Sequence, residues 1–395
     1  MQNTTAVAVT AIALGLTSFT SSALEIYKDK ENTLNVSGFF NILYVSGDGF
    51  DEMSDGASRV NFEFTRQLND GWSAFAKAEW AVNTVNSNSN LTISGDGRLA
   101  PGAADDTIST RLGYVGFKHD TYGSFSFGKQ WGTIYHITAP TDMLNAFGAE
   151  AAGSFNRGTD GGYTGVGRAE QAMQYNNSFG NLFVSAQMQA TQNEVDISEE
   201  FLNSLPEAGI PGTPFVPKDI SITYDNSYAV SAIYSLPMDI KIGLGYNVAN
   251  IEVTSNENPA LVDDVEDTMI AAHITYGSIG NYGLYAAVVA SETENHEMDN
   301  TGEIIDANGL EAVVTYRFDN NIELLAAVNQ LTADEQGNDY EMAYYVAGVG
   351  YYWSDNFKVF AEYKFDDTTY ADGQSFEDAN GVNNDVLAIG ARYVF

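Results

Sequence analysis

Four basic residues of this sequence are spaced so that they could act together on a charged or polar solute. They are Arg59, Lys77, Arg111 and Arg168. Each lies where polar and apolar residues alternate, and this alternation places all four on the polar face of an extended chain. Neighbouring strands lie about 4.8 Å apart, so the first three would spread positive charge over about 10 Å of one wall.

Each of these basic residues also has a simpler interpretation. Arg59 and Arg111 could be solvated charges with no particular role. Lys77 could be neutralised by Glu79 on the same face. Arg157 competes with Arg168 for the last position in the set.

Acidic residues that could face this basic wall occur in the long insertion 132–166. Asp142 and Glu150 are the candidates, and the glycine-rich end of the insertion, 158–167, suits a segment that turns sharply inward. Opposite charges fixed on opposing walls create a transverse field across a water-filled passage. Such a site orients and selects ions without forming or breaking bonds.

Residue patterns for other chemistry do not occur in the sequence. The four histidines have no metal-ligand spacing. No glycine-rich phosphate loop and no nucleophile elbow is found. The acidic run 263–267 lacks the spacing of a loop that wraps a calcium ion, which favours a solvated acidic loop. We therefore expect no enzymatic activity, no metal site and no cofactor.

The elements that must position these residues are stretches with an apolar residue at every second position. Sixteen of them lie near 33–45, 57–66, 71–84, 107–118, 122–131, 167–176, 180–191, 226–236, 238–250, 268–277, 281–292, 308–318, 321–332, 340–352, 356–367 and 386–395. A period of two is the signature of a β-strand. The sequence therefore predicts an all-β protein.

The connections between these stretches alternate in length. Short links such as QLND, GSIG and WSDN are followed by long links rich in Asp, Glu, Asn and Gly, for example 252–267 and 293–307. Short turns at one end and long loops at the other are typical of an outer-membrane barrel. An even number of strands places both termini on the same, periplasmic, side.

Charged residues share one face of many predicted strands. In 356–367, Lys358 and Glu362 alternate with Val359 and Tyr363. A Lys or Arg facing lipid at mid-membrane would cost about 2–4 kcal/mol, so the charged faces must line a wet interior. Side chains cannot fill a barrel of this many strands, and a channel results. These features predict a sixteen-stranded antiparallel transmembrane β-barrel.

Residues 1–23 have the pattern of a cleaved signal peptide. An apolar run is followed by small residues, with Ser21 and Ala23 at the −3 and −1 positions of a cleavage site. The segment departs from a typical signal peptide in one respect, because no Lys or Arg precedes the apolar run. We expect the barrel to comprise 24–395. The absence of cysteine fits export through an oxidising compartment.

The formal net charge of −36 excludes one class of partner. A surface that binds phosphates must be basic, so nucleic-acid binding is not expected. The acidity could simply reflect a solvated, salt-adapted surface. Alternatively, acidic loops attract solute cations, or divalent ions that bridge lipopolysaccharide. The basic wall favours anions and the acidic loops favour cations, and because the acidic excess is large we expect mild cation selectivity.

The last predicted strand ends the chain on an aromatic residue. Phe395 and Tyr393 share a face with Ala391, Ile389 and Leu387. Such a stripe is similar to the signal that the barrel-assembly machinery reads in the outer membrane. The simpler interpretation is an ordinary edge strand.

Three segments resemble the Gram-negative general diffusion porins. Residues 110–130, reading TRLGYVGFKHDTYGSFSFGKQ, resemble that family's fourth and fifth strands, and 141–150, reading TDMLNAFGAE, resemble the start of its third loop. The mature N-terminus, LEIYK, resembles the family's opening. Ala146 stands where the family's loop motif has glutamate, so the negative charge of that position is missing here.

The resemblance implies a homotrimer in the outer membrane, with a third loop that folds into the barrel and small hydrophilic solutes as cargo. It also places Lys129 at the trimer contact, where the second loop of a neighbour supplies an acid. Here that loop offers Asp96, Asp105 and Asp106. Alternatively, Lys129 could extend to the membrane edge.

Two other functions remain compatible with the sequence. The barrel could act mainly as a surface receptor or adhesin through its acidic loops. It could also be a solute-specific porin, which would need an aromatic track or a basic ladder along the lumen. Single-channel conductance separates a porin from a receptor.

Overall fold

The computed structural model describes residues 23–85, 90–93, 99–102, 107–148, 150–156, 159–190, 220–255 and 262–395. Several predictions fall outside these ranges: residues 1–22 of the expected signal peptide, the three aspartates of the second loop, and Arg157.

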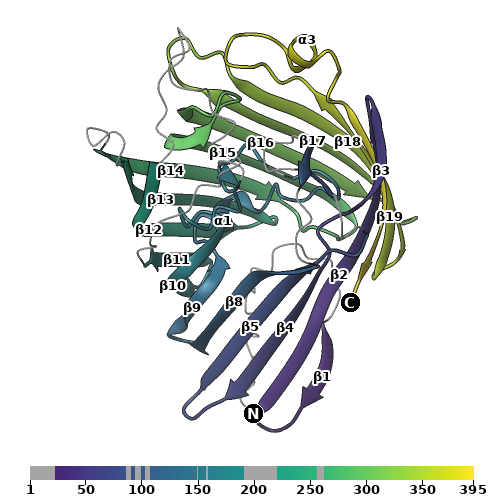
Figure 1. Ribbon diagram of the computed structural model, residues 1–395. Helices are drawn as coiled ribbons and strands as arrows, with labels where there is room; N and C mark the ends of the chain where they lie inside the picture. The colour runs from purple at the N-terminus through teal and green to yellow at the C-terminus, as the bar shows by residue number, and fades with distance from the viewer. Residues whose placement is uncertain are drawn as a thin grey trace.

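Sixteen long strands form the wall of the molecule (Figure 1). They are β2 (Asn32–Gly47), β4 (Arg59–Gln67), β5 (Trp72–Val82), β8 (Ile108–His119), β9 (Gly123–Trp131), β10 (Arg168–Phe179), β11 (Leu182–Gln189), β12 (Ile220–Leu236), β13 (Ile240–Ser255), β14 (Val262–Tyr276), β15 (Gly283–Met298), β16 (Ile304–Arg317), β17 (Ile322–Ala333), β18 (Glu341–Ser354), β19 (Phe357–Asp366) and β20 (Val386–Val394). Each overlaps one of the predicted stretches, and each pairs antiparallel with the next.

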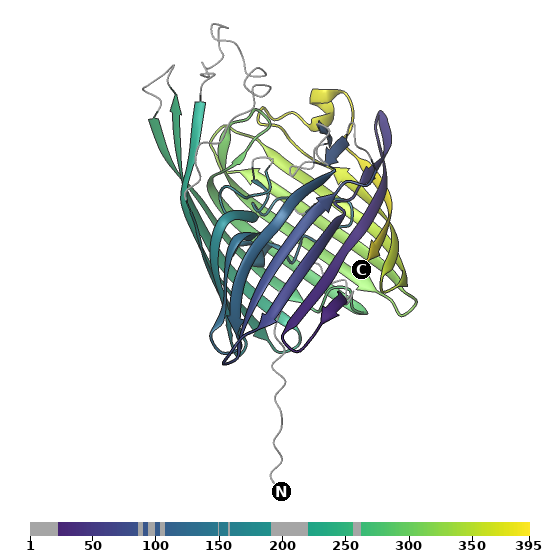
Figure 2. The ribbon, with the colours of Figure 1, turned by 60° about the horizontal axis from the view of Figure 1, so that its bottom comes forward.

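The first and last of these strands pair with each other and close the barrel (Figure 2). The register runs from Phe39 opposite Val394 to Gly47 opposite Val386. Beyond this ladder, the backbone of Gly38 exchanges two hydrogen bonds with that of Phe395, at 2.8 and 3.0 Å. Closure satisfies the backbone groups that an open sheet would leave at its edges. The prediction of a closed, sixteen-stranded antiparallel barrel is confirmed.

Two short strands that the sequence pattern did not indicate belong to the same sheet of 18 strands. β1 (Leu24–Lys28) pairs with the start of β2, and β3 (Phe50–Asp55) pairs with its end. β3 and β4 follow the same edge of β2 but are separated by a break at which Ala57 has φ of 62°. Strands of five or six residues carry too few alternations to be recognised from sequence.

Four further elements of the described part of the chain lie in connections. β6 (Asn90–Ile93) and β7 (Leu99–Gly102) pair with each other as a separate hairpin. α1 (Tyr135–Thr138) follows β9. α3 (Phe376–Asn380) precedes β20, and at its start the Ser375 side chain accepts a hydrogen bond from the backbone N–H of Asp378.

Strands β12 to β16 extend beyond the predicted bounds at the end with the long connections (Figure 2). β14, for example, begins at Val262 and so includes the acidic run 263–267, which was predicted to be a solvated loop. That prediction is wrong. The alternation of apolar residues stops where both faces of a strand become polar, although the backbone pairing continues. At the opposite end the turns are short, as predicted.

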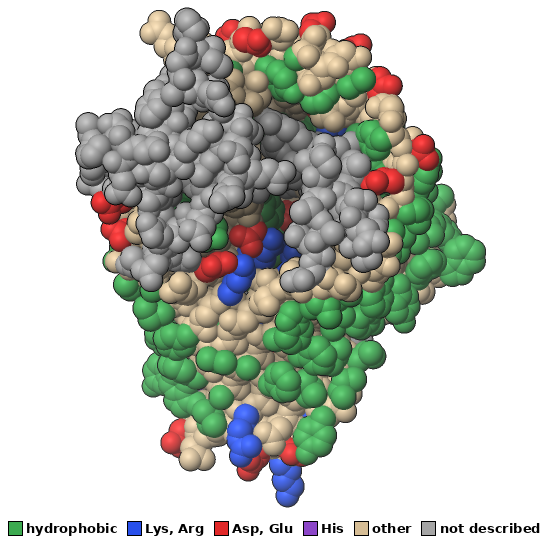
Figure 3. All heavy atoms as spheres, viewed as in Figure 1, with side chains coloured by type: hydrophobic (Ala, Val, Ile, Leu, Met, Phe, Trp, Pro, Cys, Tyr) green, Lys and Arg blue, Asp and Glu red, His purple; other side chains and the backbone are tan. Residues whose placement is uncertain are grey.

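The two faces of the wall differ in chemistry. On β13, Leu244 and Tyr246 are exposed on the outside, whereas Asn247 is fully buried on the inside. Figure 3 shows hydrophobic side chains over the outer flanks and acidic side chains around the rim. No helix in the described part of the chain is long and apolar enough to cross a membrane.

The connection 132–166 contacts the inner face of the strands, and α1 is seen inside the ring in Figure 1. Ile134 and Ile137 are fully buried, and their methyl groups occupy the space that side chains would fill at Gly243 and Gly245 of β13. The Nδ1 atom of His273 on β14 lies 2.8 Å from the carbonyl oxygen of Ile137. Glycines on the wall thus provide the room in which this helical turn packs.

Candidate functional site

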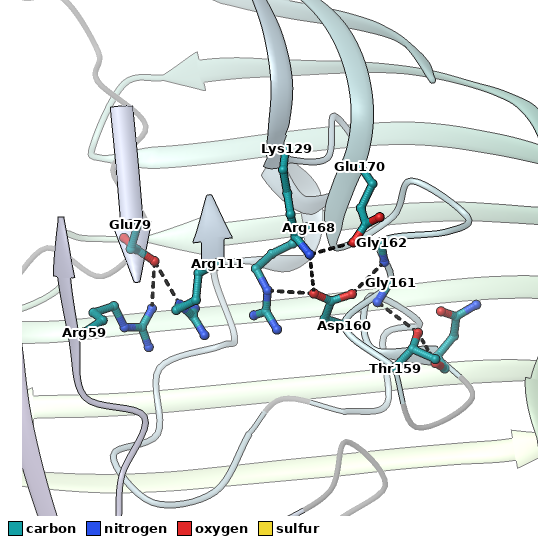
Figure 4. Close-up of polar contacts among 11 residues, drawn as sticks. Arg59, Glu79, Arg111, Lys129, Thr159, Asp160, Gly161, Gly162, Arg168 and Glu170 are labelled. Carbon is teal, nitrogen blue, oxygen red and sulfur yellow. Dashed lines mark hydrogen bonds and ion pairs between the residues drawn. The ribbon is translucent and has the colours of Figure 1, made fainter. Parts of the chain in front are cut away.

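Glu79 on β5 lies between two arginines of the predicted basic wall (Figure 4). Its Oε1 atom accepts a hydrogen bond from Nε of Arg111 at 2.9 Å and lies 3.9 Å from a guanidinium nitrogen of Arg59. The register between β5 and β8 shifts after Glu79, and this bulge leaves Arg111 outside the regular ladder, so that it can turn inward. Lys77 lies opposite Glu63 in the sheet. Glu79 thus hydrogen-bonds to Arg111 and interacts electrostatically with Lys77.

Asp160, near the end of the inner connection, joins two more basic residues. Its Oδ2 atom lies 3.1 Å from Nε of Arg168 and 3.3 Å from Nζ of Lys129. Nζ of Lys129 is also 2.7 Å from Oε1 of Glu170. Burial alone would raise the pKa of Asp160, but Arg168 and Lys129 lower that pKa below its usual value. Lys129 thus has two acidic partners within its own chain.

A fourth arginine, which the sequence analysis missed, completes the basic wall. Arg392 on β20 lies over the ring of Phe39 at 4.8 Å, and Arg59 lies over the same ring at 4.5 Å. Arg59 is close enough to Arg111, Arg168 and Arg392 for electrostatic interaction with each of them. Arg392 alternates with the outward stripe that includes Tyr393 and ends in Phe395, so strand parity was a signal that could have found it.

Asp142 is the acid that the inner connection brings to these arginines. Its Oδ2 atom accepts a hydrogen bond from the hydroxyl of Tyr135. Asp142 interacts electrostatically with Arg392, and Tyr135 with Arg59 and Arg168. Burial, followed by the charge of Asp142, raises the pKa of Tyr135 well above its usual value, so the phenol remains a hydrogen-bond donor.

Glu150 occupies a different part of the interior. Its side chain is buried and interacts electrostatically with Tyr344 and Lys364, on β18 and β19. Its backbone N–H donates to Oδ1 of Asn329 at 3.3 Å. Of the two predicted acids, the structure brings only Asp142 close to the arginines. We refer to Arg59, Glu79, Arg111, Arg168, Arg392 and Asp142 as the lumen charge cluster.

Two carboxylates that the sequence analysis did not single out fasten the inner connection to the wall. Glu362 on β19 accepts hydrogen bonds from the backbone N–H of Asn145 and of Ala146, both at 2.9 Å. Glu311 on β16 accepts from the backbone N–H of Ala151 at 2.9 Å and of Ala152 at 2.8 Å. A lone acid on the inner face of a strand was the available signal, but its partner could not be read from the sequence.

A buried histidine provides a further attachment. His296 and Asp267 are both fully buried, with Nδ1 and Oδ1 2.5 Å apart. Nε2 of His296 lies 2.7 Å from the carbonyl oxygen of Gly153 in the inner connection. Asp267 belongs to the acidic run predicted to be solvated, and the structure instead places it inside the barrel.

The lumen charge cluster can hold and orient ions, because guanidinium and carboxylate groups face one another across short distances. In the described residues, no group of three or more His, Cys, Asp or Glu side chains is arranged to hold a metal ion.

Comparisons with known proteins agree with this architecture. Residues 6–393 match the family model described as Gram-negative porin. The outer membrane porin protein LC of Enterobacteria phage PA-2 is 26% identical over 402 residues, covering 98% of this chain and 99% of the relative.

Solved structures show the same fold. An OmpF of Salmonella typhi in complex with daunomycin has a TM-score of 0.67 and 21% identity, over 94% of this chain and all of the other. The trimer form of OmpT, an outer membrane protein of Vibrio cholerae, has a TM-score of 0.61 and 17% identity, over 93% of this chain and all of the other.

The family and the fold together indicate a channel and not an enzyme. They also place the barrel in the outer membrane of a Gram-negative cell with both termini on the periplasmic side, as predicted. The chain belongs to the Gram-negative porin family.

Proposed function

We propose that the channel carries small hydrophilic solutes and ions by passive diffusion, and that the lumen charge cluster forms its constriction. The observation that carries this proposal is that Arg59, Arg111, Arg168 and Arg392 gather on the wall, where Asp142 of the inner connection interacts with Arg392. Opposite charges on facing walls produce a transverse field, which orients polar solutes and slows apolar ones.

We also propose mild cation selectivity. Glu79 lies between Arg59 and Arg111, and Asp160 lies between Arg168 and Lys129, so much of the basic charge is compensated locally. A charge further than about 8 Å away is largely screened at physiological salt. The acidic rim then tips the balance toward cations at the mouth, consistent with the net charge of −36.

Planar-bilayer recording tests both proposals. We expect open channels, a reversal potential of cation-selective sign in a KCl gradient, and liposome swelling with small but not large sugars. Arg111→Ala should raise the preference for cations, because it removes a positive charge from the constriction. A silent membrane would favour a receptor or adhesin, and an unchanged reversal potential in the variant would remove Arg111 from the constriction.

We propose a homotrimer that associates through the outer face of β4 to β9. The large hydrophobic side chains exposed on these strands are Phe64, Ile108, Val115, Phe117, Phe125 and Phe127. Those exposed on β12 to β18 include many with polar tips, such as Tyr228, Tyr246, Tyr276, Tyr316, Tyr345 and Trp353. Amphipathic rings suit the lipid–water boundary, and none of the six side chains named on β4 to β9 has one. We therefore assign the trimer contact to this face.

Lys129 lies on β9, one of the strands of this proposed trimer face. Its Nζ is directed at Asp160 and Glu170, and these two acids of its own chain compensate its charge. A trimer contact at Lys129 would therefore meet a side chain that is already paired within its own chain. Chemical cross-linking of the purified protein would test the trimer, and only a monomer after cross-linking would refute it.

The remaining partners are also proposals. Tyr393 is half exposed on the outer face, and the ring of Phe395 lies 5.7 Å from that of Phe40, so the terminal aromatics are available to the barrel-assembly machinery. The exposed acids at the rim suit lipopolysaccharide bridged by divalent cations. The cleavage after Ala23 that would leave barrel 24–395 is tested by N-terminal sequencing of the mature protein.

A further inference from the structure

The ring of Tyr135 is fixed between two other aromatic rings. It stacks on Trp131 with centroids 3.9 Å apart and planes inclined by 9°. Phe155, further along the inner connection, contacts it edge-on at 6.0 Å. Tyr135 itself is only 2% exposed. The direction of its hydroxyl is therefore set by packing, before any charged group is considered.

That hydroxyl donates to Asp142, the predicted acid of the inner connection that the structure brings near the arginine wall. Asp160 of the same connection also approaches this wall, where Arg168 and Lys129 hold it by ion pairs. Glu150 lies in a different part of the interior. The hydrogen bond that the structure shows to Asp142 comes instead from an uncharged group. A carboxylate on a short side chain can rotate, and its distance from the arginines changes as it does.

We propose that Tyr135 is a positioning residue for ion selectivity, because its hydroxyl aims the Asp142 carboxylate at the arginine wall. The inference rests on the proposed constriction and goes beyond it by assigning selectivity to an uncharged residue. A hydrogen bond to an ionised acceptor is strong and directional, so it can hold this geometry. Nothing in the role requires Tyr135 to touch the permeating ion.

The chain offers a matched control for this hydroxyl. The hydroxyl of Tyr285 on β15 also donates to the inner connection, but its acceptor is the carbonyl oxygen of Pro140, at 2.8 Å. Tyr285→Phe and Tyr135→Phe each remove one phenolic hydrogen bond from the same connection. Only the second removes a bond to a charged group.

The experiment compares reversal potentials in a KCl gradient for the wild type, Tyr135→Phe, Asp142→Asn, the double variant and Tyr285→Phe. We expect Asp142→Asn to raise the chloride-to-potassium permeability ratio about twofold, since it removes a charge at close range. Tyr135→Phe should raise the ratio in the same direction by a smaller factor. The double variant should match Asp142→Asn, and Tyr285→Phe should match the wild type.

The outcomes separate this inference from the proposed function. The positioning role would be overturned if Tyr135→Phe changed the permeability ratio equally in the wild type and in Asp142→Asn, or if it did not change the ratio at all. The constriction would remain intact in either case. An Asp142→Asn channel with unchanged selectivity would overturn the positioning role and also remove Asp142 from the constriction. Similar shifts in Tyr135→Phe and Tyr285→Phe would assign the effect to loosening of the whole connection. Wild-type membranes that do not conduct would refute the channel itself.

Discussion

The two halves of the inner wall hold their carboxylates in different ways. On β16 and β19, Glu311 and Glu362 accept hydrogen bonds from backbone N–H groups of the inner connection. On β5, Glu79 instead faces the guanidinium groups of Arg59 and Arg111. The residue type is the same, but the first pair fastens a segment of chain and the second arrangement shapes an electric field.

The difference shows that the partner determines what a lumen carboxylate does. Backbone N–H groups that enter a barrel must find acceptors, and an unpaired buried N–H costs about 1–3 kcal/mol. Guanidinium groups need a compensating charge nearby, but this does not require one fixed conformation of the chain around them. Substitutions in the first half should therefore alter the structure of the passage, and substitutions in the second should alter its selectivity.

The largest effect is expected from Glu362→Ala. Three donors lose their acceptor, the N–H groups of Asn145 and Ala146 and the side-chain amide of Asn145. Breaking a buried charged network in this way costs about 3–5 kcal/mol. We expect noisier single-channel currents and faster liposome swelling with larger sugars.

Glu63→Ala is the matched control for this variant, because Glu63 lies on β4 opposite Lys77, away from the described hydrogen bonds of Glu362 to the inner connection. It should leave the size limit of the channel unchanged. The same change in both variants would contradict the contrast between the two halves.

The next effect concerns acid pH and His136 in α1. Burial lowers the pKa of His136 to about 4, whereas in the unfolded chain the pKa is about 6.5. The neutral ring is favoured by folding, so its stabilisation is fully present above pH 6.5 and is lost as the pH falls toward 4. The loss is at most about 3 kcal/mol.

This effect is measured by heating the protein at a series of pH values and recording the temperature at which it unfolds. The wild type should lose stability between pH 6.5 and 4 more steeply than His136→Phe, which packs a similar ring against Phe183. His119→Phe, at the end of β8, should retain the wild-type pH dependence. Parallel curves for wild type and His136→Phe would contradict the prediction.

A smaller effect, on ion selectivity, is expected from Glu79→Gln in the part of the wall that carries the arginines. Arg59 and Arg111 lose a charged partner but keep a polar one of the same shape. The chloride-to-potassium permeability ratio should rise about threefold, equivalent to about 0.7 kcal/mol. Single-channel conductance should remain close to that of the wild type. Changed sugar exclusion with unchanged selectivity would reverse the roles of the two halves.

The smallest effect on selectivity is expected from Lys129→Met. Asp160 retains Arg168 as a partner, and Glu170 is partly solvated, so the net field changes little. The temperature at which the oligomer dissociates in detergent should fall if β9 lies at the trimer contact. Lys118→Met is the control, since Lys118 is an exposed residue of β8 near the periplasmic turn. Equal oligomer stability in both variants would remove Lys129 from the interface.

Much of the fold could be predicted because a membrane barrel repeats one local rule. Lipid on one side and water on the other impose alternation on every strand, as on β19, where Lys358 and Glu362 face inward and Val359 faces outward. The rule stops at the membrane boundary, so the outer ends of β12 to β16 were not predicted. It also requires length, so β1 and β3 were missed.

The site could be predicted in its residue types but only partly in its partners. Strand parity placed Arg59 in the lumen, and the resemblance indicated Asp142. The prediction for Arg111 depends on a bulge that only the structure shows. The sequence could not show that Glu79 pairs with the arginines, that Glu150 lies beside Lys364, or that Arg392 joins the cluster. These are contacts between residues far apart in the chain, and no local periodicity encodes them.

The amino-acid sequence by itself determined the sixteen long strands of the wall, the direction of most of their side chains and the acidity of the rim, because each follows from short-range alternation or from composition. Only the tertiary structure decided which side chains meet inside the barrel. Those meetings depend on the path of 132–166 along the inner wall, set by a few long-range hydrogen bonds such as those from Asn145 to Glu362 and from Tyr135 to Asp142. A carboxylate in the sequence carries a charge, and its neighbours in space give that charge a function.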